Sequence, residues 1–366
     1  MTVATAEDRR WKQRLHSGPL DTPEALAFAE FVLNRVSRTF ALNIRVLPRA
    51  LRNQVLYAYL YCRMADTIED DPTLPTAEKS RLLHAFAALF DPALPEQQAL
   101  EAFSAFPTLL PASWQATEHN EDWEKILLGR APVVLQAFPT FPAPARAAIA
   151  RCVIEMCDGM AGFAVQREER AQQGRALIET VTELDRYCYY VAGTVGVMLC
   201  DLFIDYAKIS SERAEKMRAL CVSFGLGLQL TNILKDVRDD SERGVSWLPP
   251  DLTLAQAFAK ARGHLEDSLE YTLLIPRLQR RLRLFCLWPL LMAAETLALL
   301  ATNTEALSSG RRLKITRARV ARILLRTRLF YFSNTWLRAE FRAALKTPNS
   351  PVTALPIPLP PDTFKP

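Results

Sequence analysis

The sequence predicts an all-α fold, and three observations support this prediction. Glycine, which is frequent in the turns of β-sandwiches and barrels, accounts for only 12 of the 366 residues, under half of its usual share of about 7%. Alanine, leucine and arginine, which favour helices, are abundant. No stretch between turn signals shows the alternation of polar and apolar residues that predicts a β-strand.

Apolar residues recur at helical spacing, and prolines separate the segments in which they do so. The first segment carries Phe28, Val32 and Val36 on one helix face. Prolines, which end or interrupt helices, follow at intervals up to a cluster at residues 138–144. Long helices are expected at residues 50–70, 77–90, 120–136, 146–170, 178–205, 211–238, 255–300 (with a break near Pro276) and 316–345.

The chain has no obvious linker, so a single helical domain is expected over residues 21–346. Residues 1–20 are polar and are predicted to form a flexible N-terminal arm. Residues 347–366 are rich in proline and are predicted to form an extended C-terminal tail.

Charge, cysteine content and hydropathy argue against several classes of protein. The formal net charge of +5 is too small to indicate a nucleic-acid partner. The seven cysteines form no CxxC pair and are expected to be reduced core residues of a cytoplasmic protein. Met1 opens directly into polar sequence, so no signal peptide is expected. The most apolar stretch, residues 284–300, contains Pro289 and Glu295, which predicts a buried core helix rather than a membrane span.

Two acidic segments at the ends of apolar helices carry the candidate chemistry. In the first segment, Asp66 and Asp70 are four residues apart and share a helix face, with about 6 Å between their Cβ atoms. In the second segment, Asn232, Asp236 and Asp240 form an i, i+4, i+8 series on one face. The neighbouring cations are Arg63 and Lys235.

Oxygen ligands on two helices suit Mg²⁺, which keeps several waters and prefers sites completed by substrate phosphates. Each segment alone can also be interpreted as a solvated helix end. Two such segments, each with a nearby cation, favour the metal interpretation. The reaction they indicate is metal-assisted departure of diphosphate, in which Mg²⁺ and cations stabilise the charge that develops on the leaving group.

Five segments in sequence order form a further pattern: Ser37–Phe40, Tyr59–Asp70, Tyr187–Gly196, Asn232–Asp240 and Phe285–Pro289. In this order they resemble the squalene and phytoene synthases, the head-to-head prenyl transferases, and within that family they resemble the squalene synthases most. One segment alone would be a weak signal, whereas five in register over roughly residues 30–320 are specific.

The resemblance implies a terpenoid-synthase helical bundle with a central cavity, two farnesyl diphosphate substrates and bound Mg²⁺. By position, it implies that the Mg²⁺ ligands are Asp66, Asp70, Asn232, Asp236 and Asp240. It implies that the diphosphates are bound by Ser37, Arg38, Arg63 and Lys235. It implies that the reacting centre is lined by Phe40, Tyr59 and Tyr187, with Tyr187 transferring a proton or stabilising a cation.

The activity that the resemblance implies is condensation of two farnesyl diphosphates to presqualene diphosphate, followed by NADPH-dependent reductive rearrangement to squalene, a step of sterol or hopanoid biosynthesis. The residues expected near NADPH are Val195, Gln229, Asn232, Lys314 and Arg317. Without a hydride donor the product would be dehydrosqualene, or phytoene from C20 substrates. Release of presqualene diphosphate itself is a third alternative.

Three features favour the branch without NADPH. Tyr189 stands where many squalene synthases have histidine, Lys235 replaces the usual arginine, and residues 243–249 resemble phytoene synthases. A lysine in place of arginine weakens any bidentate phosphate contact. The sequence therefore leaves the choice of product open.

Several of these residues also have a purely structural interpretation. Arg63 can serve only to pair with Asp66, and Tyr187 can be a core tyrosine with a satisfied hydroxyl. Glycines inside expected helices cost about 1 kcal/mol each relative to alanine. They are explained either by room for isoprenoid chains or by close helix–helix contact, and they are found at residues 159, 162, 193, 196, 225 and 227.

Residues 311–328 contain eight Arg or Lys residues and no acidic residue. This basic run can be a solvated face, a site for the NADPH phosphate, or a surface for peripheral contact with an anionic membrane.

An RNA-binding function is disfavoured because exposed aromatic residues are not interleaved with the basic ones. A non-catalytic scaffold is disfavoured because both acidic segments are intact. Zinc is not expected because the four histidines are scattered, and we expect a monomer.

Overall fold

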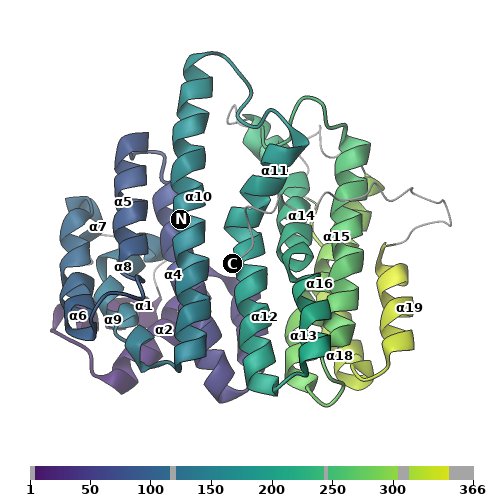
Figure 1. The fold of residues 1–366 in the computed structure, drawn as a ribbon, viewed down its shortest axis with the longest axis horizontal. Helices are drawn as coiled ribbons and strands as arrows, with labels where there is room; N and C mark the ends of the chain where they lie inside the picture. The colour runs from purple at the N-terminus through teal and green to yellow at the C-terminus, as the bar shows by residue number, and fades with distance from the viewer. Residues whose placement is uncertain (1–4, 116–120, 243–245, 304–312, 346–366) are drawn as a thin grey trace. The chain divides into compact units, whose positions relative to one another are not determined.

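The computed structural model of the chain describes residues 5–115, 121–242, 246–303 and 313–345 (Figure 1). Over these ranges the regular structure is helical and no strand is present, which confirms the all-α prediction. The chain divides into two compact units, Met1–Val165 and Gln166–Pro366. The predicted tail at residues 347–366 lies outside the described residues.

The first unit consists of short helices around one long helix, α4. Its helices are α1 (Ala6–His16), α2 (Thr22–Val36), α3 (Arg38–Val46), α4 (Arg49–Asp70), α5 (Thr76–Ala88), α6 (Glu96–Ala105), η1 (Phe106–Leu109), α7 (Ala112–Gln115), α8 (Trp123–Gly129), α9 (Ala131–Leu135) and η2 (Phe138–Thr140), followed by most of α10 (Ala143–Gln172). Helix α4 packs against α2, α3, α5 and α8, and this packing positions the first acidic segment at its end.

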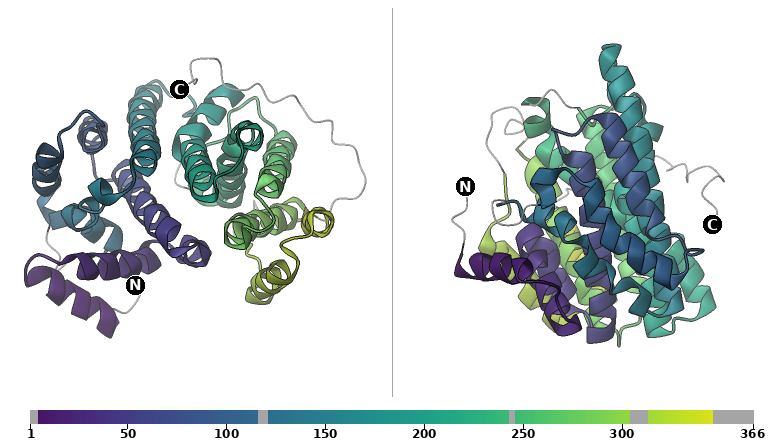
Figure 2. Two further views of the ribbon diagram at one scale, coloured as in Figure 1. Left: turned by 60° about the horizontal axis from the view of Figure 1, so that its bottom comes forward. Right: turned by 90° about the vertical axis from the view of Figure 1, so that its left-hand side faces the viewer.

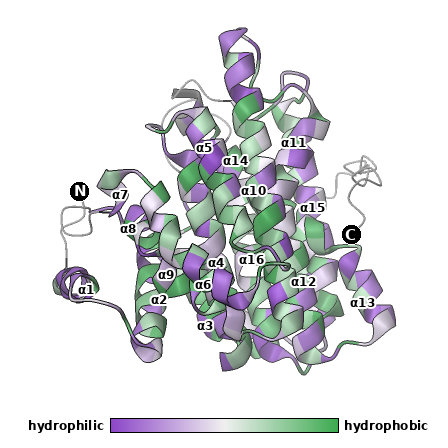
Figure 3. Cartoon of the chain, turned by 60° about the vertical axis from the view of Figure 1, so that its left-hand side comes forward, coloured by the Kyte–Doolittle hydropathy of each residue, from purple (hydrophilic) through white to green (hydrophobic). Residues whose placement is uncertain are grey.

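Part of the segment predicted as a flexible arm forms helix α1. The helix begins with a capping box, in which the Thr5 side chain accepts the backbone N–H of Asp8. Trp11 packs its ring against Phe28 and Phe31 of α2, at centroid distances of 5.6 and 5.7 Å. Most of α1 is otherwise hydrophilic, as Figure 3 shows.

The second unit surrounds helix α14. It contains the end of α10, then α11 (Val181–Cys188), the π-helical turn η3 (Tyr189–Gly193), α12 (Thr194–Ala207), α13 (Ser211–Arg218), α14 (Cys221–Glu242), α15 (Leu254–Leu274), α16 (Arg280–Ala301), α18 (Arg317–Phe330) and α19 (Asn334–Leu345). Helix α14 packs against α11, η3, α12, α15 and α16, several of which are seen nearly end-on in the left view of Figure 2.

Glycines allow this close packing around α14. A Cβ atom built on Gly225 would lie 2.1 Å from the carbonyl oxygen of Ala192, and one built on Gly196 would lie 2.3 Å from that of Cys221. Real Cβ atoms do not approach backbone this closely, so a side chain at either position would force the helices apart. Of the two explanations for the helical glycines, close helix contact therefore holds at these positions, whereas the space beside Gly162 is open.

Helix α16 forms part of the core of the second unit, as predicted for residues 284–300. Leu284, Trp288 and Leu291 are buried, and the Trp288 indole N–H donates to the Thr327 hydroxyl at 3.0 Å. Three segments are long and apolar enough to cross a membrane by length and composition, Val181–Ala207, Ser211–Val237 and Arg280–Ala301. Between 50% and 72% of their apolar windows is buried inside the structure. All seven cysteines are buried and free, as expected.

Candidate functional site: two acidic helix segments

Helix α4 places the first group of candidate residues on one face at the spacing of successive turns. The Arg63 guanidinium Nη2 donates to the Tyr59 hydroxyl at 3.2 Å, and the guanidinium carbon lies 5.9 Å from the centre of the Tyr59 ring. Arg63 Nη1 is also 3.7 Å from a carboxylate oxygen of Asp66 and 3.7 Å from one of Glu124 in α8. The structure thus brings Tyr59, Arg63 and Asp66 together, as the sequence predicts.

Asp66 sits in an electrostatic environment that disfavours its charge. Burial raises its pKa to about 7, and the nearby Asp70 and Glu124 carboxylates add to this effect while Arg63 opposes it. The Asp66 side chain is 30% exposed, and the last residue of the helix, Asp70, is exposed. A partly buried carboxylate with a raised pKa is a candidate for a functional site, because an added cation would stabilise its charged form.

Glu124 belongs to this group, although nothing in the local sequence indicates it. Its carboxylate lies on a different helix and is 3.7 Å from Arg63. Burial, and then the Asp122 and Asp70 carboxylates, raise the pKa of Glu124, while Arg63 lowers it. Arg63 therefore faces more than one carboxylate. These interactions and the Tyr59 hydroxyl raise the pKa of Arg63 despite the opposing effect of burial, so the guanidinium remains charged.

The start of α3 supplies a second aromatic ring to the same group. The Phe40 ring lies 5.3 Å from the Tyr59 ring and is 36% exposed. Ser37, expected to bind diphosphate, caps this helix: its hydroxyl accepts the Phe40 N–H at 3.2 Å. The Arg38 side chain lies outside the described residues.

Asp71 directly follows α4 and has a different environment from Asp66. Its buried side chain pairs with Lys125 Nζ at 2.6 Å and accepts the Thr73 N–H at 2.8 Å. Burial alone would raise the pKa of Asp71, but these partners lower it below its usual value. Asp71 is therefore a neutralised structural carboxylate, whereas Asp66 is not.

The second acidic segment lies near the end of α14 and is organised around Lys235. The Lys235 ammonium donates to the Asn232 amide oxygen at 3.3 Å and pairs with Asp236 at 3.1 Å. Asn232 is exposed, and the Asp236 side chain is 46% exposed. Asp240 follows one turn later and is half-buried. The structure thus joins three of the predicted residues of this segment by direct contacts.

Tyr187, at the end of α11, is buried against an aromatic partner that the sequence did not identify. Its ring stacks on Trp247 with a centroid distance of 4.4 Å and an interplanar angle of 17°. The Arg167 guanidinium covers the same Trp247 ring at 4.9 Å. The π-helical turn that follows Tyr187 is a feature often found at functional sites.

The residues expected to bind NADPH divide into two sets. The first set is Val195 on α12 with Gln229 and Asn232 on α14. Val195 and Gln229 are half-buried, Asn232 is exposed, and the two helices pack against each other. Lys314 and Arg317 are exposed around the start of α18. Among the described residues, no hydrogen bond or ion pair joins the second set to the first.

Each acidic segment offers hard oxygen donors beside a cation, a donor set that suits a magnesium diphosphate. Within either unit, the described residues contain no cluster of three His, Cys, Asp or Glu side chains that would hold a metal by itself. Burial, with the Asp70 and Glu124 carboxylates, raises the pKa of Asp66, so a bound cation would stabilise its charged form. Asp66 and Asp70 therefore fit Mg²⁺ as partial ligands.

Comparison with known proteins gives the class. The model of the family described as squalene/phytoene synthase matches residues 33–259. The chain is 27% identical to squalene synthase of Schizosaccharomyces pombe, over 83% of this chain and 65% of that protein. It is 30% identical to squalene synthase 1 of Arabidopsis thaliana, over 82% of this chain and 71% of that protein. The chain thus spans about two thirds of the length of these relatives.

Solved structures agree on the fold. The complex of TcSQS with the ligand E5700 superimposes with a TM-score of 0.71 at 25% identity, over 88% of this chain and 91% of that chain. A dehydrosqualene synthase is more distant, with a TM-score of 0.56 at 20% identity over 85% of this chain and 98% of that one, and shares the fold. The chain belongs to the squalene/phytoene synthase family.

Proposed function

We propose that this protein joins two farnesyl diphosphates head to head and reduces the product to squalene. One observation carries the proposal: α4 presents an incompletely neutralised Asp66 beside Arg63 and Tyr59, the set of groups that a departing magnesium diphosphate requires. The squalene synthases among its relatives support this substrate class.

Mg²⁺ would be held by Asp66 and Asp70 of the first segment and by Asn232, Asp236 and Asp240 of the second, and when bound it supplies positive charge to the diphosphate oxygens. NADPH, when bound near Val195 and Gln229, supplies the hydride that distinguishes squalene from dehydrosqualene.

The chain's own residues then have distinct tasks in the first step. Arg63 and Lys235 bind diphosphate oxygens, and the carboxylates and the Tyr59 hydroxyl around Arg63 hold its guanidinium in place. The Phe40 and Tyr59 rings face the allylic cation and stabilise it through their π electrons. The C2=C3 double bond of the second substrate attacks C1 of the first, and loss of a proton closes the cyclopropane of presqualene diphosphate.

In the second step, presqualene diphosphate loses its diphosphate, and its carbon skeleton rearranges before the hydride arrives. We assign Tyr187 to proton transfer or cation stabilisation, with its ring orientation fixed by Trp247. Apolar side chains around the reacting carbons exclude water, which would otherwise capture the cation as an alcohol.

Product analysis tests the proposal. The protein is incubated with farnesyl diphosphate and Mg²⁺, with and without NADPH, and the hydrocarbons and released diphosphate are measured. We expect squalene only with NADPH. Dehydrosqualene in both reactions would assign the chain to the branch without NADPH, which the Tyr189 and Lys235 replacements favour. No released diphosphate in either reaction would overturn the enzyme assignment.

A further inference from the structure

Two neighbouring turns of the second unit expose apolar side chains. The turn between α15 and α16 presents Leu278, which is 95% exposed, and the end of α18 with its following turn presents Leu329 and Phe332, which are 57% and 50% exposed. The turns are in contact, because Arg283 Nη1 donates to the Tyr331 carbonyl oxygen at 3.0 Å and the Arg280 guanidinium lies 5.5 Å from the centre of the Tyr331 ring. We call residues 276–281 and 328–333 the two-turn surface.

The segments that form the two-turn surface are strongly basic. Residues 275–286 and 313–334 contain no Asp or Glu. Their ten cationic residues are Arg277, Arg280, Arg281, Arg283, Lys314, Arg317, Arg319, Arg322, Arg326 and Arg328. Among the described residues, two of the ten are paired with carboxylates of other helices, Arg319 with Glu295 and Arg326 with Glu340. Arg277 and Arg281 flank Leu278 and are exposed.

A cavity of about 400 Å³ beside Leu278 concentrates this positive charge. Arg213, Arg277, Arg283 and Asn334 contribute its polar lining. Arg283 is 1% exposed, and its guanidinium donates to the carbonyl oxygens of Leu273, Ile275 and Tyr331 and to the Asn334 amide oxygen, at 2.8–3.0 Å. Among the described residues none of its acceptors is a carboxylate. Burial, then Arg277 and Arg213, lower the pKa of Arg283 to about 10.

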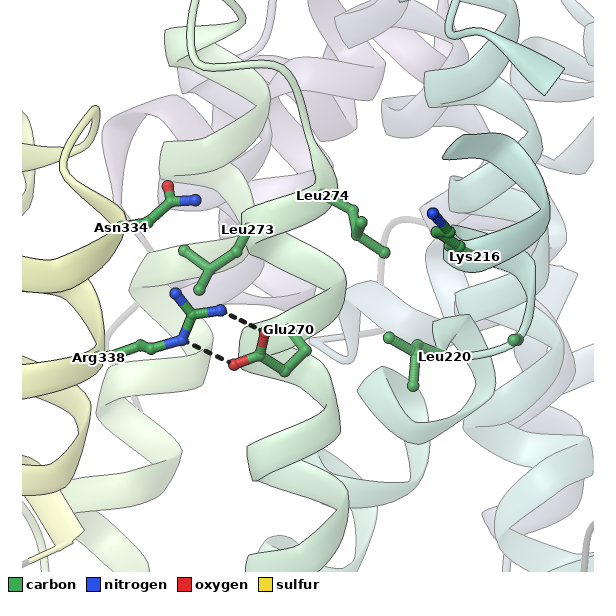
Figure 4. A pocket seen from close by; sticks show the side chains of 8 residues that line it. Lys216, Leu220, Glu270, Leu273, Leu274, Asn334 and Arg338 are labelled. Atoms are coloured by element: carbon green, nitrogen blue, oxygen red, sulfur yellow. Dashed lines mark hydrogen bonds and ion pairs between the residues drawn. The ribbon is translucent and has the colours of Figure 1, made fainter. Parts of the chain in front are cut away.

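The groove next to this cavity, which we call the arginine cavity, contains a carboxylate that could neutralise the arginines but is already paired. Figure 4 shows this groove, which shares Leu273, Leu274 and Asn334 with the arginine cavity. Its one carboxylate, Glu270, accepts two hydrogen bonds from Arg338 at 3.0 and 2.6 Å. Glu270 is therefore already paired, and the arginine cavity retains an excess of positive charge that favours an anion from outside the chain.

We propose that the two-turn surface docks on an anionic lipid bilayer. Leu278, Leu329 and Phe332 would enter the headgroup region, the exposed arginines would contact anionic headgroups, and the cavity of Arg213, Arg277 and Arg283 would accept a lipid phosphate. A soluble phosphate would account for the arginine cavity but not for a leucine that is 95% exposed between two arginines. Exposed apolar side chains within a basic surface are typical of peripheral membrane binding. This proposal goes beyond the enzymatic activity and does not depend on it.

Vesicle flotation with the full-length protein tests the proposal without substrate. We expect binding to phosphatidylcholine vesicles that contain phosphatidylglycerol, little binding to phosphatidylcholine alone, and weaker binding at high salt because the charges are screened. The double variant Arg277→Gln/Arg281→Gln should lose about 25-fold in binding, from about fivefold per arginine. Leu278→Ser/Phe332→Ser should lose at least about tenfold from lost apolar burial.

Matched controls lie in the first unit. Arg10→Gln/Lys12→Gln on α1 and Leu100→Ser on α6, where Leu100 is 42% exposed, should bind vesicles like the unmodified protein. Thermal unfolding of each variant verifies folding. If the unmodified protein binds inorganic phosphate but no vesicles, the bilayer proposal is overturned. The proposal is also overturned if the variants of the two-turn surface bind vesicles like the controls. A third contrary result would be that Leu278→Ser abolishes self-association in sedimentation while vesicle binding persists.

Discussion

The acidic segments of α4 and α14 have similar sequences but different environments. On α4, the Asp66 side chain is 30% exposed, and its pKa is raised to about 7 by burial and by neighbouring carboxylates. On α14, the Asp236 side chain is 46% exposed and lies 3.1 Å from Lys235 of its own helix. The Asp66 carboxylate is partly buried and shares Arg63 with Glu124, whereas the Asp236 carboxylate is more exposed and pairs with Lys235.

This difference assigns different tasks to the two segments. A desolvated carboxylate gains more from a bound cation than a solvated one, because it has less water to lose. We therefore expect α4 to dominate metal affinity. Lys235 is exposed at the second segment and pairs with Asp236, and we expect it to bind a diphosphate oxygen when substrate is present.

Removing either set of carboxylates is expected to have the largest effect. Asp66→Ala or Asp236→Ala should lower kcat/KM for diphosphate release about 1,000-fold, because several kcal/mol of stabilisation of the leaving group is lost. Raising the Mg²⁺ concentration should restore part of the activity of Asp236→Ala and less of that of Asp66→Ala. Steady-state assays over a Mg²⁺ series measure both.

Asp71 provides the matched control for this experiment. It lies five residues from Asp66 but is paired with Lys125. Asp71→Asn should therefore retain near-normal kcat/KM at temperatures where it is folded. Unchanged turnover in Asp66→Ala, or a loss in Asp71→Asn equal to that in Asp66→Ala, would contradict the metal assignment.

Asp66 and Asp71 are also expected to change stability in opposite directions. The pKa of Asp66 is about 7 in the folded protein and about 3.9 when unfolded. Without metal, its ionisation therefore destabilises the fold increasingly from about pH 4 to pH 7, and fully above pH 7. The pKa of Asp71 is lowered, so its stabilisation is present above about pH 4 and is lost in acid.

Urea unfolding in EDTA measures this contrast. At pH 8, Asp66→Asn should raise the free energy of unfolding by up to about 4 kcal/mol, and Asp71→Asn should lower it by about 1–3 kcal/mol. The gain in Asp66→Asn should disappear near pH 4. A loss of stability in Asp66→Asn at pH 8 would show that its carboxylate is neutralised within the fold.

The two cations are expected to differ in the geometry they require. Arg63 is held by Tyr59, Asp66 and Glu124, so Arg63→Lys should lower kcat/KM about 100-fold by removing the planar fork. Lys235→Met should lower it about tenfold, because only a mobile point charge is lost. Lys208, an exposed lysine paired with Asp205, is the control. Equal losses in Arg63→Lys and Lys235→Met would remove the distinction between the segments.

Much of the helical framework follows from the sequence. Helix α4 was expected at residues 50–70 and spans Arg49–Asp70, because its apolar residues keep helical spacing up to a stop before Pro72. The expected helix at residues 211–238 is instead divided into α13 and α14 at residues 219–220. Neither glycine nor proline marks that break. Helical periodicity alone therefore does not predict this break.

The site was predictable where its residues share one helix. Asp66 and Arg63, like Asp236 and Lys235, are close in sequence, and their spacing alone places them together. Glu124 and Trp247 reach their partners from segments about 60 residues away. Nothing in the local sequence connects them, so only the folded chain identifies them as neighbours of Arg63 and Tyr187.

Diphosphate binding by single variants tests most directly whether α4 dominates metal affinity. Isothermal titration calorimetry would measure Mg²⁺-dependent binding of inorganic diphosphate to the unmodified protein, Asp66→Asn, Asp236→Asn and the control Asp71→Asn. We expect Asp66→Asn to weaken binding more than Asp236→Asn does, and Asp71→Asn to bind like the unmodified protein. Equal binding by Asp66→Asn and the unmodified protein would contradict the account.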